Sequence, residues 1–141
     1  MKQTTFFFVL IFFSVASCQS QNAEVEQIKK TITEFSKAGD QQDATTLSQY
    51  LDPNFRIVMN QLFGNNEVMV VSKADYLEKI KSKKWGGDTR TLTFGTIEVN
   101  GNVAFAKVIL TGKKSTFHSL MLLVRNASGQ WVLAEDVPTV K

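Results

Sequence analysis

Short turns divide the C-terminal half of the sequence into segments, and this division constrains the fold more than any other feature. Asn100-Gly101 is the dipeptide most typical of a two-residue hairpin, and glycine-containing turns follow at 112–114 and 126–129. Connections this short join antiparallel neighbours, so the sequence predicts an antiparallel meander. Its expected strands are Arg90 to Val99, Val103 to Thr111, Thr116 to Arg125 and Gln130 to Val137.

The N-terminal half has the pattern of amphipathic helices. Apolar residues recur there at spacings of three, four and three, which places them on one face of a helix from about residue 23 to residue 38. Gly39 is placed to end this helix. The apolar face consists of Val25, Ile28, Ile32 and Phe35.

Two shorter helices are expected further along the chain. Asp43 can cap a helix that continues to about Tyr50. Ser72 and Asp75 resemble a capping box for a third helix that continues to about Lys83. The sequence therefore predicts three helices before the meander begins.

A hairpin is expected between the second and third helices. The segments 55–62 and 67–71 are rich in β-branched and large residues and flank a turn at 64–66. The residues 52–54 (DPN) are expected to end the second helix before the first of these strands. Three helices, a hairpin and a long meander together predict an α+β domain whose helices pack on one face of a sheet.

This order of elements resembles the nuclear transport factor 2-like superfamily. The resemblance rests on Gly39-Asp40 at the end of the first helix, the run from Tyr50 to Phe55 and the run from Gly129 to Leu133. The segment from Phe117 to Arg125 is most similar to the putative lumazine-binding branch. The resemblance implies a cone of three N-terminal helices on a strongly curved antiparallel sheet, open at one end to a small ligand. It also implies a homodimer that forms through the outer face of the sheet.

The resemblance also bears on chemistry. Ketosteroid isomerase-like members of the superfamily carry a tyrosine donor on the first helix and a carboxylate base on the first strand. In this sequence the matching positions are Phe35 and either Met59 or Asn60, none of which can donate or abstract the required proton. We therefore expect no steroid-type isomerase activity.

The N-terminus has the layout of a bacterial secretion signal. Lys2 provides a positive charge, an eight-residue apolar run extends from Phe6 to Phe13, and small residues precede Cys18. The run is shorter than the roughly 18 residues that a membrane-spanning helix needs. The segment from Val15 to Cys18 (VASC) resembles the lipobox of bacterial lipoproteins, in which the cysteine is acylated and the signal is removed directly before it.

The lipobox resemblance implies a lipoprotein with three parts: a signal peptide (1–17), a lipidated tether (18–22) and the folded domain (23–141). Acyl chains such as palmitate on Cys18 would hold the domain on a membrane, facing the periplasm or the cell surface. Gln19 directly after the cysteine is compatible with sorting to the outer membrane, which we expect rather than the inner membrane.

Composition restricts the other partners. Cys18 is the only cysteine, so no internal disulfide and no thiolate metal site is expected, and the sequence predicts neither a metal nor a cofactor. The chain has 16 basic and 13 acidic residues, and removal of Lys2 with the signal lowers the net charge from +3 to +2. A charge so near neutrality argues against nucleic acid as a partner.

His118, the only histidine, is the first candidate for catalysis. On a strand it shares a face with Leu120, opposite Ser119. Glu135 and Asp136 of the next strand point to opposite faces, so one of them can share a face with His118. Such a pair could act as a base and its orienting group. Alternatively, His118 is a hydrogen-bonded or exposed residue near the start of its strand.

Candidates for ligand binding come from the first strand and from aromatic residues. Arg56 and Asn60 lie on one side of that strand and could orient an anionic or carbonyl-bearing ligand, although a solvated edge explains them at least as well. Tyr50, Tyr76 and Trp85 could rim the pocket, and ordinary core packing is the alternative for each.

The leading hypothesis from the sequence is a membrane-anchored lipoprotein domain that binds a small, mostly apolar ligand in a conical cavity and performs no chemistry. The first alternative is a dehydratase- or isomerase-type enzyme, which requires His118 inside the cone within reach of Glu135 or Asp136. The second is a protein-interaction module that binds a different partner on its sheet.

Overall fold

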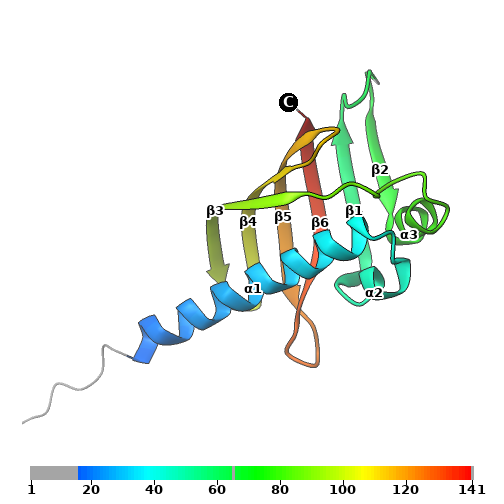
Figure 1. The fold of residues 1–141 in the computed structure, drawn as a ribbon. Helices are drawn as coiled ribbons and strands as arrows, with labels where there is room; N and C mark the ends of the chain where they lie inside the picture. The colour runs from blue at the N-terminus through cyan, green and yellow to red at the C-terminus, as the bar shows by residue number, and fades with distance from the viewer. Residues whose placement is uncertain (1–15, 65, 141) are drawn as a thin grey trace, which may run out of the picture.

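The computed structural model describes residues 16–64 and 66–140, so most of the expected signal peptide lies outside the described residues. Within the described residues, helices and strands follow one another in the expected order (Figure 1). The helices are α1 (Ala16–Asp40), α2 (Ala44–Ser48) and α3 (Lys73–Lys81). The strands are β1 (Leu51–Asn60), β2 (Val68–Ser72), β3 (Thr91–Asn100), β4 (Val103–Thr111), β5 (Thr116–Arg125) and β6 (Trp131–Val140).

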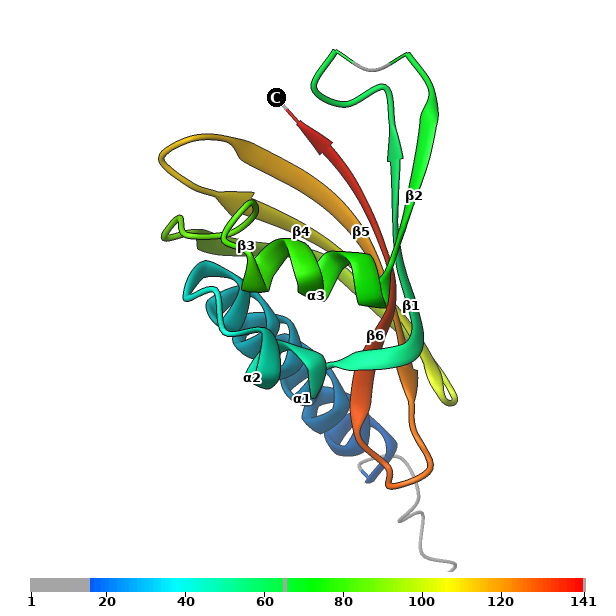
Figure 2. The ribbon, with the colours of Figure 1, turned by 90° about the vertical axis from the view of Figure 1, so that its right-hand side faces the viewer.

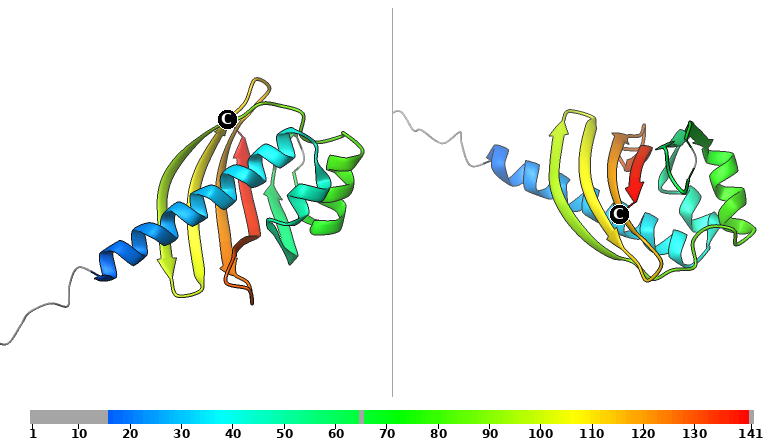
Figure 3. Two further views of the ribbon diagram at one scale, coloured as in Figure 1. Left: turned by 60° about the horizontal axis from the view of Figure 1, so that its bottom comes forward. Right: turned by 90° about the horizontal axis from the view of Figure 1, so that it is seen from above.

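Helix α1 lies across one face of the sheet (Figure 3). Its expected apolar face is confirmed, since Ile28, Ile32 and Phe35 are buried and Val25 is half-buried. The helix begins at Ala16, so positions 18–22, which we expected to form a tether, are helical. No glycine or proline precedes Gly39 in this helix to interrupt it.

No helix in the described part of the chain is long and apolar enough to cross a membrane.

Both predicted helix caps are confirmed. The Asp43 carboxylate accepts a hydrogen bond from the backbone N–H of Thr46 at 3.0 Å, and the Ser72 hydroxyl accepts one from the backbone N–H of Asp75 at 3.2 Å. These caps fix where α2 and α3 begin.

The six strands in the described residues form one sheet in the order β2-β1-β6-β5-β4-β3. The predicted antiparallel meander from β3 to β6 is confirmed. The sequence did not predict that β1 would pair with β6 in parallel, which places Ile57 opposite Asp136. This pairing joins the hairpin to the meander and makes one continuous sheet.

Helix α2 ends before 52–54 as expected, but the strand that follows begins earlier than the predicted Phe55, because β1 already begins at Leu51 and contains Pro53. The strand accommodates the proline because its register with β6 shifts between Leu51 and Arg56. At such an irregularity a residue without an N–H leaves no ladder hydrogen bond unmade.

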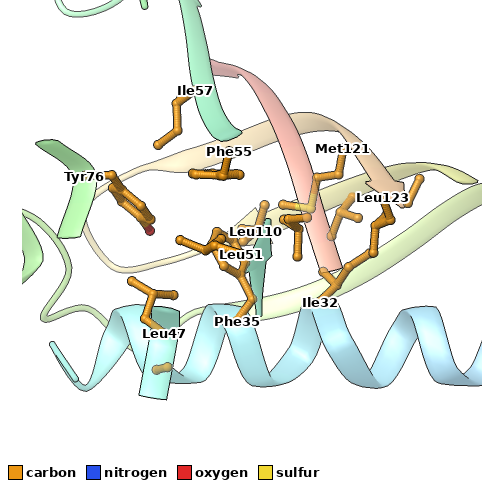
Figure 4. Close-up of a cluster of buried hydrophobic side chains, with 14 of the residues drawn as sticks. Ile32, Phe35, Leu47, Leu51, Phe55, Ile57, Tyr76, Leu110, Met121 and Leu123 are labelled. Carbon is orange, nitrogen blue, oxygen red and sulfur yellow. The ribbon is translucent and has the colours of Figure 1, made fainter. Parts of the chain in front are cut away.

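The sheet is strongly curved, and the helices lie on its concave side (Figure 2). Alternate residues of β4 show which side is the core: Ala104, Ala106 and Val108 are buried, whereas Phe105 and Lys107 are exposed. Figure 4 shows how side chains of the concave face meet those of the helices. The core includes Ile32, Phe35, Leu47, Leu51, Phe55, Ile57, Tyr76, Leu110, Met121 and Leu123.

Two leucines of β5 allow a matched test of this orientation. Leu123 is 0% exposed and Leu120 is 51% exposed on the opposite face. We expect Leu123→Ala to lower the free energy of unfolding by about 2–5 kcal/mol through lost burial and an unfilled cavity. Leu120→Ala should cost about 1 kcal/mol or less. Urea unfolding of both variants checks this, and equal losses would contradict the assigned faces.

Candidate functional site

A cavity of about 320 Å³ lies between the helices and the concave face of the sheet. Its volume is at the lower end of the range of small-molecule pockets. Residues of α1, α3 and the segment 84–90 form one wall, and residues of β1, β4, β5 and β6 form the other. Most of the lining is apolar: Phe35, Ile57, Met59, Phe63, Tyr76, Ile80, Trp85, Leu110, Phe117 and Pro138.

Aromatic rings make up much of the wall. The ring centroid of Tyr76 lies 6.3 Å from that of Phe35 and 5.9 Å from that of Trp85. The exposed Phe63 contacts Phe117 edge-to-face, with centroids 6.3 Å apart. Rigid flat surfaces of this kind suit contact with a flat apolar ligand.

The cavity reaches the end of the sheet that lies away from the start of α1. Met59 near the end of β1, Pro138 near the end of β6 and Ser115 before β5 all line it. At the other end of β5, Arg125 forms an ion pair with Glu24 in the N-terminal half of α1. The opening and the N-terminus of α1 are therefore at opposite ends of the domain.

An ion pair in the cavity wall links the end of α1 to the segment before β3. The Arg90 Nε atom lies 2.5 Å from Asp40 Oδ1, and the Arg90 backbone N–H donates to Asp40 Oδ2 at 2.9 Å. Arg90 Nη2 also donates to the Ser36 carbonyl at 3.3 Å. Gly86 contacts the Gly39 carbonyl so closely that a side chain there would collide with it. These contacts hold the last turn of α1 against the cavity wall.

One carboxyl group lines the cavity from the sheet side. Asp136 lies on β6 opposite Ile57 of β1 and Met121 of β5, and it is 8% exposed. Burial raises its pKa to about 7, although the neighbouring Ser119 hydroxyl and the positive charge of Arg90 each act to lower it. Within residues 16–64 and 66–140, the Asp136 Oδ1 atom has no hydrogen-bond partner. Asp136 is thus a buried acid whose hydrogen bonding is incomplete.

Tyr76 faces the same group of charges from α3. Burial raises the pKa of its hydroxyl above the ordinary value, and the negative charges of Asp136 and Asp40 act in the same direction, against Arg90. Tyr76 is therefore neutral at physiological pH. It can offer the cavity a hydroxyl group as well as an aromatic ring.

The structure places His118 outside the cavity, which corrects the pairing considered from the sequence. Phe117 and Ser119 both line the cavity, so His118 between them on an extended strand takes the outer face. Asp136 faces the cavity, whereas Glu135 lies on the outer face, where its Oε2 atom is 2.6 Å from Arg56 Nη2. The condition for the enzyme hypothesis, a His118–carboxylate pair inside the cone, is not met.

The candidates for ligand binding are also divided between the outer face of the sheet and the cavity. Arg56 and Asn60 are exposed on the outer side of β1, since Ile57 and Met59 line the cavity. Among the aromatics, Tyr76 and Trp85 line the cavity. Tyr50 instead packs, partly buried, against the core. A role in ligand contact stays a prediction for Tyr76 and Trp85.

Two positions named by the resemblance to ketosteroid isomerases do lie in the cavity. Phe35 and Met59 both line it, so the positions of the tyrosine donor and the carboxylate base are occupied by side chains that transfer no proton.

The outer face of the sheet carries the exposed apolar residues Val103, Phe105 and Leu120. The expected homodimer would form on that face, and it stays a prediction.

Sequence reasoning missed several polar residues of the cavity wall, among them Ser119, Arg90 and Asp40. Ser119 was assigned to the face opposite His118, but nothing in the pattern showed which face was the inner one. Arg90 and Asp40 are 50 residues apart in the chain. Their pairing has no local signal, because it depends on how α1 lies across the sheet.

Asp136 should make stability depend on pH. Its pKa is higher in the folded chain than the ordinary value of 3.8, so the folded state holds this proton more tightly than the unfolded state. Its contribution to stability is therefore greatest at low pH and is lost as the pH rises from about 4 to about 7, by up to about 4 kcal/mol.

The variant Asp136→Asn keeps the shape of the protonated acid and removes the titration. We expect it to match the unmodified protein near pH 4.5 and to be more stable by a few kcal/mol at pH 8. Chemical unfolding across this range checks the expectation, with Glu98→Gln, which removes an exposed carboxylate of β3, as control. A stability difference between Asp136→Asn and the unmodified protein that does not change with pH would contradict it.

Comparison with solved structures identifies the fold. The chain superimposes on a nuclear transport factor 2-like protein of unknown function from Silicibacter pomeroyi with a TM-score of 0.74 and 12% identity, over 86% of this chain and 98% of that one. A ketosteroid isomerase-like protein from Erwinia carotovora gives a TM-score of 0.66 and 17% identity, over 84% and 97% of the two chains. At such low identity the likeness shows the nuclear transport factor 2-like fold alone.

A third protein with this fold, from Cytophaga hutchinsonii, gives a TM-score of 0.67 and 15% identity over 82% of this chain and 97% of that one. A search among curated proteins gives no significant match. The model of one protein family matches residues 23–137, which is nearly the whole predicted domain. This chain therefore belongs to the family described as putative lumazine-binding.

Proposed function

We propose that this protein is a lipid-tethered, extracytoplasmic domain that binds a small, mostly apolar ligand in its conical cavity. The observation that carries the proposal is the 320 Å³ cavity, walled by aromatic and aliphatic side chains and open at one end of the sheet. A lining of this composition favours an apolar ligand because binding removes apolar surface from water on both sides. Membership of a family described as putative lumazine-binding supports a small organic ligand.

The polar groups of the cavity are better suited to binding a ligand than to catalysing a reaction. Asp40 and Arg90 are engaged with each other, and His118 lies on the outer face. Phe35 and Met59 fill the two positions at which a ketosteroid isomerase-like protein would carry its donor and base. Further polar residues line the cavity, and among them Asp136, Ser119 and Tyr76 can orient a ligand by hydrogen bonds.

In this proposal the lipid anchor and the cavity opening lie at opposite ends of the domain. Cys18 lies in the first turns of α1, at the end of the domain opposite the cavity opening. Anchoring at Cys18 would then direct the opening away from the bilayer. The ligand would enter from the aqueous compartment rather than from the lipid.

Cavity binding can be tested by filling the cavity. Met59 lines it, whereas Val58, the preceding residue, is on the outer side of β1. We expect native mass spectrometry of the unmodified protein, after incubation with envelope extract, to show a bound small molecule. Met59→Trp should lower its occupancy at least tenfold by occupying the space, while Val58→Trp should retain it.

Thermal unfolding of both tryptophan variants checks that each still folds cooperatively. The proposal would be wrong if the unmodified protein carried nothing after incubation. It would also be wrong if Met59→Trp, correctly folded, bound as much as Val58→Trp.

The lipid anchor has its own test. We expect the protein from bacterial cells to fractionate with membranes and to begin at Cys18 with the added mass of its acyl chains. Cys18→Ser should lose that mass and leave the membrane fraction, whereas Ser20→Ala should behave as the unmodified protein does. A purified protein that starts at Met1 and lacks acyl mass would refute the anchor and leave the cavity proposal standing.

A further inference from the structure

One group in the cavity is not explained by packing. Asp136 lies opposite the apolar residues Ile57 and Met121 of the two neighbouring strands, and its Oδ1 atom has no partner in the described part of the chain. Burial of a carboxyl group costs free energy unless hydrogen bonds replace its lost water. A leucine of similar size would fill the same space without this cost.

The protein's own donors do not complete the hydrogen bonding of this carboxyl group. Arg90 uses Nε and its backbone N–H on Asp40, and Nη2 on the Ser36 carbonyl. Ser119 has one hydroxyl proton to offer. A carboxylate accepts more hydrogen bonds than this, so Asp136 retains the capacity to accept one from a bound molecule.

The rest of the cavity restricts what that molecule can be. Phe35, Tyr76 and Trp85 present ring surfaces, which favour a flat, aromatic body of modest size. Asp136 stands on the sheet side, facing these rings across the cavity. A flat ligand that contacts these rings with its edge turned toward the sheet would bring a polar edge group to the carboxyl group.

We propose that Asp136 is the recognition point of this cavity and that the ligand is a flat aromatic heterocycle whose N–H group donates to its carboxylate. This inference rests on the proposed function, because it requires that the cavity binds a small molecule. It adds the chemical class of the ligand and names the residue that selects it.

The inference implies that binding depends on pH. A ligand N–H stabilises the ionised form of Asp136, so binding lowers the pKa of this carboxyl, and affinity for the donor must rise as the pH increases through about 7. The charged and titratable groups that act on Asp136 or line the same cavity are Tyr76 of α3, Asp40 of α1, Arg90 before β3, and Lys84, Asp88 and Lys114.

Indole and benzofuran are suitable probes, because they have nearly the same shape and only indole carries an N–H donor. In NMR titrations of the full-length protein at pH 8, we expect indole to bind about tenfold more tightly than benzofuran, the effect of one hydrogen bond to a charged acceptor. The preference should shrink at pH 5.5, where Asp136 is protonated. This comparison needs no variant.

Two variants complete the test. Asp136→Leu should bind both probes with equal affinity, whereas Glu135→Gln, which changes the neighbouring acid on the outer face, should keep the preference for indole. Equal affinities in the unmodified protein at pH 8, or a preference for indole that survives in Asp136→Leu, would overturn the inference and leave the proposed function intact. Failure of both probes to bind the cavity would count against the proposed function and the inference together.

Discussion

The packing of α1 across the concave face of the sheet is the contact on which the rest of the structure depends. A strongly curved sheet cannot bury its inner face against itself, so that face needs a helix to cover it. Ile28, Ile32 and Phe35 provide one buried stripe, and α3 adds Tyr76 and Ile80 from the other side of the cone. These helices cover the inner face incompletely, and the space they leave between them is the cavity.

The order of elements could be predicted because each boundary has a local cause. The turn at Asn100-Gly101 and the caps at Asp43 and Ser72 act over two to four residues, which a single sequence displays directly. The parallel pairing of β1 with β6 joins residues about 80 positions apart, such as Arg56 and Glu135, and leaves no such signal. Pro53 misled the prediction for the same reason, because the irregular pairing that accommodates it is set by a distant strand.

The candidate site was only half predictable, because a period of two shows which residues share a face but not which face is inside. On β5 both faces are apolar: Leu120 and Leu122 alternate with Met121 and Leu123. The meander alone therefore left His118 and Ser119 as equal candidates for the cavity. The helices decide between them, since they cover the face that carries Ser119.

The same geometry explains why Asp136 lies in the cavity whereas the neighbouring Glu135 does not. Glu135 and Asp136 are neighbours in sequence, but the pleat sends Glu135 to Arg56 on the outer face and Asp136 into the cavity. The first gains an ion pair that water screens, which contributes little to stability. The second is buried beside apolar side chains, where an incompletely bonded carboxyl destabilises the empty protein and gives a matching donor a strong interaction. In the recognition that we propose, this acceptor selects the ligand by the position of a single proton, and the aromatic wall supplies most of the remaining affinity.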